Sequence, residues 1–495
     1  MTQTTIPDTV ENAASCICPR CPSFPEDCNT ETLYCARGES QCEIVVKGCT
    51  CAGCQVYRRY EMEGLYFCDK TIDQAGNLTR KKRLGEEDTN YQQMVGIKQM
   101  ARTGKSIVCS MGSRKRFPFS FDDLHFVPAQ ISRTPLERED RVTTEVTIGP
   151  RARRPLKVSS PIVISGMSLG ATSRNVKLVV SKASSMLGIA YNSGEGGILE
   201  EEFRSAPNQI IAQYPTYTTL IDSEILRKVV AVEIRFGQGA YPGQASILPD
   251  SKILTVPADA RGIGGVEQAY SPAHHHDMKT AEDIRNKVTW LREETRGVPI
   301  GAKIGCGAIE ADVEILVESG VDFIALDGFG GGTGGTEQYV RENVGIPIIA
   351  GLPRASRLLK KLGHQNDVTL VAGGGLRSSA DFAKCLSLGA DAVYIATAAL
   401  IAINCEQYRL CHTGLCPTGV TTHNRLLAGQ LDVQKGVEKL FNFVKVSTDE
   451  VASFTRIVGK DDIKMLDTDD LVSTTEQLAK MTATRWLGDI WKPQS

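Results

Sequence analysis

Short apolar runs separated by helical patterns recur along the chain from Pro155 onward. This alternation predicts strand–helix–strand units that share one parallel sheet. Eight such runs fit a sheet closed on itself, so the predicted class is α/β, a (β/α)8 TIM barrel. In that fold the active residues lie on loops after the C-terminal ends of the strands. The predicted strands are residues 161–165, 188–192, 231–236, 299–304, 321–326, 346–350, 368–372 and 391–396.

The predicted barrel accounts for only part of the 495-residue chain, and further segments precede and follow it in the sequence. We expect a disordered arm over residues 1–15, a Cys-rich metal or iron–sulfur module over 16–70, and a linker with a barrel-covering segment over 71–154. The barrel takes residues 155–430, and residues 431–495 form a C-terminal helical extension.

One stretch of the predicted barrel combines a glycine loop with closely spaced cysteines. Gly373-Gly374-Gly375 follows the apolar run 368–372, and a helical pattern runs from Ser378 to Leu388. Glycine-rich loops at helix N-termini expose backbone N–H groups that bind phosphate. The next strand and helix lead into a C-x5-C-x4-C run that can hold an iron–sulfur cluster. Its members are Cys405, Cys411 and Cys416. The stretch therefore predicts an electron-transferring flavin site.

A second group of cysteines lies near the N-terminus. Cys16-x-Cys18-x2-Cys21 recurs as Cys49-x-Cys51-x2-Cys54. So small a segment buries little core, and metal binding would supply the missing folding energy. Iron–sulfur clusters and structural zinc both fit, and the redox domain that follows favours iron–sulfur. The ferredoxin pattern is absent, and a disulfide scaffold would need a secreted chain. The ten cysteines are Cys16, Cys18, Cys21, Cys28, Cys35, Cys42, Cys49, Cys51, Cys54 and Cys68.

Charge and hydropathy exclude several classes of partner. Lys plus Arg number 56 against 58 Asp plus Glu, a net charge of −2, so neither nucleic acid nor a membrane surface is expected. The sequence contains no apolar run as long as the ~18 residues of a transmembrane helix. Residues 1–12 do not have the basic and apolar regions of a signal peptide. We expect a cytoplasmic protein, where cysteines serve as metal ligands more often than in disulfides.

The motifs between about residues 155 and 471 resemble the synthase domain of the glutamate synthase family. In order they are PIVISGMSLGATSR, YNSGEGG, QGAYPG, SPAHHHD, GAKIGCGA, GGGTGG, AGGGLR and the cysteine run, which is followed by Pro-Thr-Gly. The resemblance implies bound FMN and a 3Fe-4S cluster on Cys405, Cys411 and Cys416. It also implies that electrons enter through clusters, from a donor protein such as ferredoxin.

The resemblance assigns roles to residues in the predicted loops. Glu195 would lie near the flavin and the substrate, and Lys303 would lie at the pyrimidine edge of the flavin as a second catalytic group. Without the resemblance, Glu195 could be a solvent-exposed carboxylate and Lys303 one half of a buried ion pair. The residues expected to contact FMN are Gly166, Met167, Ser168, Asn192, Ser193, Lys303, Gly331, Gly332, Thr333, Gly334, Gly373, Gly374, Gly375, Ala396 and Thr397.

The substrate positions depart from the family pattern. Tyr241 stands where the family has a Lys that helps bind 2-oxoglutarate, and Gln244 stands for a Glu. Gln238 is kept, and Arg261 falls at the carboxylate-binding Arg. We therefore expect Gln238, Tyr241 and Arg261 to bind the substrate, with half of the keto-acid site retained.

Three functions remain open. The first is reduction of an imine derived from a 2-oxo acid, giving glutamate or a related amino acid. The second is a flavin and iron–sulfur oxidoreductase acting on a different carboxylate, and the third is a non-catalytic electron-transfer protein. The sequence shows no counterpart of the family's glutaminase domain, so ammonia would come free or from a separate amidotransferase subunit. We also expect a homo-oligomer.

Overall fold

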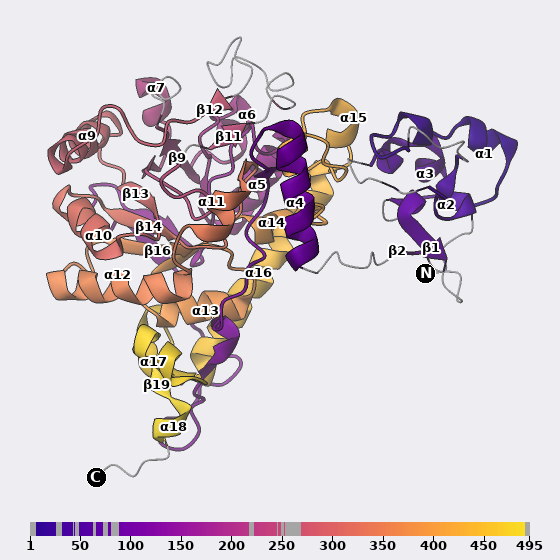
Figure 1. The fold of residues 1–495 in the computed structure, drawn as a ribbon. Coiled ribbons are helices and arrows are strands. Elements are labelled where there is room, and N and C mark those ends of the chain that lie inside the picture. Colours follow the sequence, from indigo (N-terminus) through magenta and orange to yellow (C-terminus); the bar gives the residue numbers. More distant parts are fainter. Residues whose placement is uncertain are drawn as a thin grey trace.

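A closed barrel of eight parallel strands forms the centre of the protein (Figure 1). The computed structural model describes residues 6–25, 32–42, 44, 49–62, 66–72, 78–80, 89–216, 222–244, 246–248, 252 and 269–490. The closed sheet confirms the predicted (β/α)8 class. Its strands in spatial order are β7 (Ile162–Ile164), β8 (Tyr191–Asn192), β9 (Ile210–Tyr214), β10 (Ala231–Arg235), β13 (Ile300–Gly305), β14 (Phe323–Asp327), β16 (Thr369–Gly373) and β17 (Ala392–Ile395).

One strand assignment made from the sequence is wrong, and one strand was missed. Most of the predicted strand 346–350 belongs to the start of helix α12 (Ile348–Leu362), and β9 was not predicted. A short apolar run fits a buried strand or the buried face of a helix equally well. Here Pro347 lies at the N-cap of α12, and Ile348 and Ile349 pack into the core. β9 was missed because only the short helix α6 (Glu200–Ser205) separates it from β8.

Helices pack around the barrel with their apolar faces inward. α13 begins with a capping box in which Ser378 and Asp381 bond each other's backbone N–H groups, which fixes the helix start after the glycine loop. The helices around the barrel and on its upper loops are α5 (Arg174–Leu187), α6, α7 (Ser223–Leu226), α9 (Ala281–Glu294), α10 (Ile309–Glu318), α11 (Gln338–Asn343), α12, α13 (Ser379–Ser387), α14 (Thr397–Ile403), α15 (Arg425–Ala428) and α16 (Val433–Ile457).

Small antiparallel pieces cover the barrel. β5 (Val146–Ile148) pairs with β6 (Leu156–Val158) and lies at the N-terminal end of the strands, because Gly149 N donates to Thr369 Oγ1 over 2.9 Å. β11 (Ile247–Leu248) pairs with β12 (Ala269–Tyr270), and β3 (Val108–Cys109) pairs with β15 (Thr336–Glu337). The C-terminal elements are α17 (Glu476–Thr482), α18 (Leu487–Ile490) and the sheet of β4 (Leu124–Phe126), β18 (Leu471–Ser473) and β19 (Arg485–Trp486).

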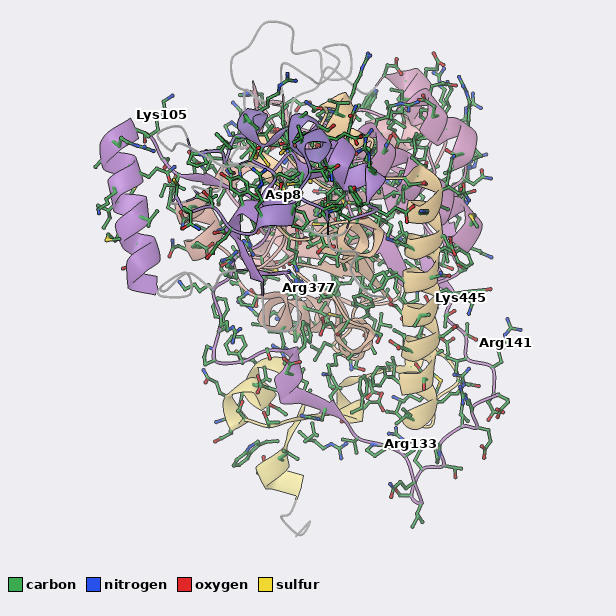
Figure 2. All side chains as sticks on the ribbon, turned by 90° about the vertical axis from the view of Figure 1, so that its right-hand side faces the viewer. Asp8, Lys105, Arg133, Arg141, Arg377 and Lys445 are labelled. Carbon is green, nitrogen blue, oxygen red and sulfur yellow. The ribbon has the colours of Figure 1, made fainter. Side chains whose placement is uncertain are left out.

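The Cys-rich module forms a separate small body next to α15 (Figure 1). Figure 2 shows the module toward the viewer, with Asp8 labelled on it and helix α4 (Thr89–Thr103) standing to one side. Its elements are α1 (Val10–Ala14), α2 (Tyr34–Arg37), α3 (Gln55–Arg59), β1 (Lys70–Ile72), β2 (Leu78–Arg80) and the 3-10 turns η1 (Cys18–Arg20), η2 (Cys51–Gly53) and η3 (Phe67–Asp69). Within the described ranges, every helix is too short or too polar to cross a bilayer.

Candidate functional site

Glycines let several loops approach one another closely above the C-terminal ends of the strands. Gly330, Gly374 and Gly375 have φ of +99°, +118° and +88°, a region that disfavours other residues. A Cβ at Gly374 would stand 2.5 Å from the backbone N of Gly328, and one at Gly239 would overlap the carbonyl of Gly328. The loops after β10, β14 and β16 therefore need glycine to pack as they do.

These loops enclose a pocket that contains many of the predicted FMN contacts. The pocket has an empty volume of about 440 Å³, and Lys303 and Asp327 lie on its wall. The predicted residues that line it are Gly166, Lys303, Gly331, Gly332, Gly373, Gly374, Gly375, Ala396 and Thr397. Backbone N–H groups on such loops suit a phosphate, because no side chain stands between them and the ligand.

Lys303 is a buried cation inside this pocket. Its side chain is 3% exposed, and Nζ donates to Ser165 Oγ over 2.9 Å. Nζ lies 3.8 Å from Asp327 Oδ2 and 5.1 Å from the centre of the Tyr394 ring. Asp327 Oδ2 also accepts a hydrogen bond from Gly239 N over 3.0 Å. The buried positive charge of Lys303 is thus balanced by the Asp327 carboxylate and by the hydrogen bond to Ser165, as a buried charge requires.

Glu233 joins four strands through a buried carboxylate. It lies on β10 with no exposed surface, and Oε1 accepts from Asn192 Nδ2 on β8 and Gln213 Nε2 on β9, both over 2.8 Å. Oε2 accepts from the Tyr394 hydroxyl on β17 over 2.9 Å, and burial followed by the Glu233 charge raises the pKa of Tyr394. Asn192 Oδ1 in turn accepts from Gly194 N over 2.8 Å, which fixes the loop that carries Glu195.

Asn192 and Ser193 fix this loop by hydrogen bonds. Ser193 offers its carbonyl to Lys177 Nζ over 2.6 Å, and Lys177 is itself paired with Glu202 over 3.1 Å. Met167, Ser168, Thr333 and Gly334 line a second, larger cavity next to the glycine pocket.

Glu195 is held by a guanidinium and two hydroxyls. Arg235 Nη2 lies 2.9 Å from Glu195 Oε2, and the exposed fractions of the two side chains are 3% and 11%. Ser246 Oγ donates to Oε1 over 3.0 Å, and Ser271 Oγ donates to Oε2 over 2.8 Å. Glu195 lines the larger cavity. Its partners therefore hold the carboxylate as an oriented hydrogen-bond acceptor at the cavity wall.

Tyr241 contacts the same guanidinium. Arg235 Nη1 donates to the Tyr241 hydroxyl over 3.0 Å, and burial raises the pKa of Tyr241. Gln238 and Tyr241 both line the larger cavity, and Gln244 Nε2 donates to Glu337 Oε2. Arg261, the predicted carboxylate anchor, lies outside the described residues.

The neutral His275 fixes the end of β10 behind Arg235. Its Nε2 donates to the Arg235 carbonyl over 3.0 Å, since a carbonyl can only accept. Burial lowers the pKa of His275 to about 4. This histidine positions the strand end that carries Arg235.

Cys405, Cys411 and Cys416 line the larger cavity, whose empty volume is about 1130 Å³ including its opening to solvent. Gln407 N points at Cys405 Sγ over 3.4 Å, and Cys416 Sγ lies 3.4 Å from Thr418 Oγ1. Across the described part of the chain, no three Cys, His, Asp or Glu side chains converge tightly enough for a single metal ion. Three closely spaced thiols are a donor set of the kind that holds an iron–sulfur cluster.

The thiol loop is tied to the glycine loop through one short segment. Arg409 Nη1 donates to Gly112 O over 2.9 Å, and Ser110 Oγ donates to Arg409 O over 2.8 Å. Met111 N then donates to Thr333 O in the glycine loop over 2.8 Å. Lys252 adds a positive charge to the wall of the larger cavity. Its Nζ donates to Ala171 O over 2.8 Å.

Eight of the ten N-terminal cysteines line a third cavity, inside the module. Cys42 is disulfide-bonded, and Cys28 lies outside the described residues. The eight are Cys16, Cys18, Cys21, Cys35, Cys49, Cys51, Cys54 and Cys68.

The chain is similar in sequence to known proteins. A family model described as the conserved region in glutamate synthase matches residues 91–461. The chain belongs to the glutamate synthase family. The resemblance seen in the motifs is thereby confirmed, and the protein is a glutamate synthase-like oxidoreductase. A second model, described as a protein of unknown function (DUF2769), matches residues 16–69.

Individual relatives cover most of the chain. The glutamate synthase large subunit-like protein of Rhizobium meliloti is 36% identical over 417 residues, which are 80% of this chain and 94% of that protein. The archaeal glutamate synthase (NADPH) of Methanocaldococcus jannaschii is 32% identical over 401 residues, 75% of this chain and 78% of that protein. The archaeal-type glutamate synthase (NADPH) of Dehalococcoides mccartyi is 30% identical over 474 residues, 91% of each chain.

The sequence analysis missed Arg235, Glu233 and Lys252. The first two had a signal, because Glu233 and Arg235 stand two residues apart in an otherwise apolar strand and so share one face. That spacing places both inside the barrel. Lys252 lies in a polar stretch whose pattern indicated nothing.

Arg235→Met should destabilise the protein by about 3–5 kcal/mol, because it leaves the largely buried Glu195 carboxylate without its cation. Adding Glu195→Gln should restore part of the loss. As a control, Arg354→Met breaks the exposed pair with Glu310 and should cost about 1 kcal/mol or less. Chemical denaturation measures all four proteins. Equal losses for Arg235→Met and Arg354→Met would contradict the buried pair.

Proposed function

We propose that this glutamate synthase-like protein reduces an imine, formed from a 2-oxo acid and an amine, to an amino acid, using FMN and a three-iron cluster. The supporting observation is that the glycine pocket and the thiol-lined cavity share one wall. Both are lined by Gly166, Gln238, Gly332, Ala396 and Thr397. A flavin across this wall would have the cluster on one side and the substrate loops on the other.

FMN fits the glycine pocket with its phosphate on the loops after β14 and β16. Lys303 Nζ would stand near the ring, where a fixed positive charge stabilises negative charge on the reduced flavin. Bound FMN supplies hydride transfer to the imine carbon. Ser165 and Asp327 keep Lys303 in place, so no reorganisation is needed when charge develops.

Glu195, Arg235 and Gln238 form the substrate side. Glu195 is a carboxylate acceptor held by Ser246 and Ser271, positioned to orient the amine N–H or to receive a proton from it. Arg235 pairs with Glu195 and fixes its carboxylate in place. Gln238 offers an uncharged amide to a substrate carboxylate or carbonyl. Arg261 is the proposed carboxylate anchor, by the family resemblance.

Electrons reach the flavin through a cluster held by the three thiols. We assign the three-iron cluster to Cys405, Cys411 and Cys416, with the Gln407 N–H stabilising the charge on the Cys405 sulfur. A donor protein such as ferredoxin would deliver the electrons one at a time. A separate amidotransferase subunit would deliver ammonia if free ammonia is not the nitrogen source.

A different carboxylate substrate is the second candidate, and Tyr241 favours it. The residue offers a hydroxyl already engaged by Arg235, where the family pattern has a Lys. A dicarboxylate such as 2-oxoglutarate loses one positive partner, so a 2-oxo acid with one carboxylate or with an amide end would bind relatively better.

Lys303→Met should weaken FMN binding by about 10- to 150-fold, since a hydrogen bond to a charged group contributes about 1.5–3 kcal/mol. Titration of the flavin-free protein with FMN, followed by flavin fluorescence, gives the Kd. Lys445→Met, on the exposed face of α16, should bind FMN like the wild type. Unchanged FMN affinity together with an unchanged flavin reduction potential would show that Lys303 does not contact the flavin.

Flavin reoxidation by a panel of 2-oxo acids, each with ammonia or methylamine, tests the substrate class. Arg261→Ala should weaken binding of the best acid by about 10- to 150-fold, because a guanidinium–carboxylate contact is lost. Arg141→Ala, on the surface, is the control. Fastest turnover with 2-oxoglutarate would exclude the altered-substrate candidate. A panel in which no acid perturbs the flavin would contradict both enzyme proposals.

A further inference from the structure

The Cys-rich module contains an internal repeat that is offset by 33 residues, from Cys16 to Cys49. Four cysteines of the first half have a counterpart at the same offset in the second half. The matched pairs are Cys16 and Cys49, Cys18 and Cys51, Cys21 and Cys54, and Cys35 and Cys68. Cys28 and Cys42 have no counterpart, since Glu61 and Thr9 stand at the corresponding positions.

The two halves also share their backbone geometry. In each, a 3-10 turn carries the second cysteine, and the N–H of the third donates to the carbonyl of the second over 2.9 Å, from Cys21 to Cys18 and from Cys54 to Cys51. The residues before the turns have φ of −103° and −105°. The repeat is therefore present in the backbone conformation as well as in the spacing of the cysteines.

A strained residue in each half directs an amide at the first thiol. Leu33 and Tyr66, again 33 residues apart, have φ of 64° and 58°. Such values are rare and costly for bulky residues. Leu33 N donates to Cys16 Sγ over 3.2 Å, and Tyr66 N donates to Cys49 Sγ over 3.3 Å. An N–H aimed at sulfur stabilises a thiolate, so each half is built around a charged sulfur.

The eight thiols around the module cavity divide into two sets of four. In the first, Cys54 packs in one apolar cluster with Cys16 and Cys35. Cys18 adjoins Cys16 and completes this set. Set one is Cys16, Cys18, Cys35 and Cys54.

The other four thiols repeat this arrangement. The 33-residue offset relates Cys16, Cys18 and Cys35 to Cys49, Cys51 and Cys68, and it relates Cys54 to Cys21. Cys51 adjoins Cys49 as Cys18 adjoins Cys16. Set two is Cys49, Cys51, Cys68 and Cys21.

Each set thus takes three cysteines from its own half and one from the other half. Cys21 of the first half joins set two, and Cys54 of the second half joins set one. The same exchange occurs in bacterial two-cluster ferredoxins, where the last cysteine of a run binds the other cluster. The cysteine spacing here is different, so the exchange comes from the pseudo-twofold geometry of the module.

The space between the thiols suits clusters better than zinc. A tetrahedral zinc site brings its sulfurs to about 3.8 Å from one another, as Zn–S bonds of about 2.3 Å require. Among the described residues no three such ligands converge in this way. The eight thiols instead surround a cavity with an empty volume of about 550 Å³ including its opening to solvent, whose walls include Phe24, Met62 and Phe67.

We propose that the module binds two 4Fe-4S clusters, one on each set, with Cys21 and Cys54 exchanged between the halves. Set two lies against the barrel, because Cys49 and Cys51 pack with Tyr408 and Leu410. The rings of Tyr66 and Tyr408 are 5.6 Å apart between centres, and Tyr408 lies between Cys405 and Cys411. The clusters pass electrons from a one-electron donor protein to set one, then to set two, and then to the barrel thiols.

Iron and sulfide analysis of the full-length, anaerobically purified protein tests the clusters. Cys35→Ser and Cys68→Ser should each lose about four iron and four sulfide per chain relative to the wild type. Cys42→Ser, in the same module but outside both sets, should lose none. Stoichiometric zinc in the wild type, or an equal iron loss in Cys42→Ser, would overturn the proposal. Retained FMN shows that each variant is folded, so this outcome is separate from that of the substrate tests.

Electron paramagnetic resonance of the reduced variants tests the exchange. Cys54→Ser should leave the same residual cluster spectrum as Cys35→Ser, because both remove set one. Cys21→Ser should match Cys68→Ser, because both remove set two. If Cys21→Ser matches Cys35→Ser instead, each half binds its own cluster and the exchange is wrong.

Discussion

The carboxylate of Glu233 accepts hydrogen bonds from side chains on three other strands, and the mouth of the barrel depends on it. Burying an ionised group without partners would cost several kcal/mol, so Asn192, Gln213 and Tyr394 are committed to it. Asn192 then orders the loop that carries Glu195, and the Tyr394 ring lies beneath the Lys303 ammonium. One buried charge therefore positions both the substrate side and the flavin side of the site.

A second constraint is that the thiol loop must lie next to both the glycine loop and the Cys-rich module. The thiol loop reaches the glycine loop through Ser110, Met111 and Gly112, and reaches the module through the Tyr66–Tyr408 contact. Arg377, labelled in Figure 2 on the side that faces the module, donates to Gln407 in the thiol loop over 3.1 Å. The barrel thus supplies rigid strand ends, while short loops bring the sulfur-bearing segments to its mouth.

The sequence was informative where the chemistry requires one residue type. Closed-barrel architecture, the glycine loops and the clustering of the three barrel thiols with them followed from local pattern and spacing. The apolar run at 346–350 was misassigned because β-strand and buried helix share that composition, and β9 was hidden by short connections. The pairing of Arg235 with Glu195 joins residues that are distant in sequence, so no local pattern contains it. The exchange of Cys21 and Cys54 likewise depends on how two half-modules face each other.

The central claim is that Cys405, Cys411 and Cys416 hold a three-iron cluster beside the flavin. Electron paramagnetic resonance of the oxidised, anaerobically purified protein tests it most directly, because an oxidised 3Fe-4S centre is paramagnetic whereas oxidised 4Fe-4S clusters of the ferredoxin type are silent. The account predicts this signal in the wild type and in Cys385→Ser, whose buried thiol lies on α13, and its loss in Cys411→Ser. A signal that survives Cys411→Ser unchanged would contradict the assignment.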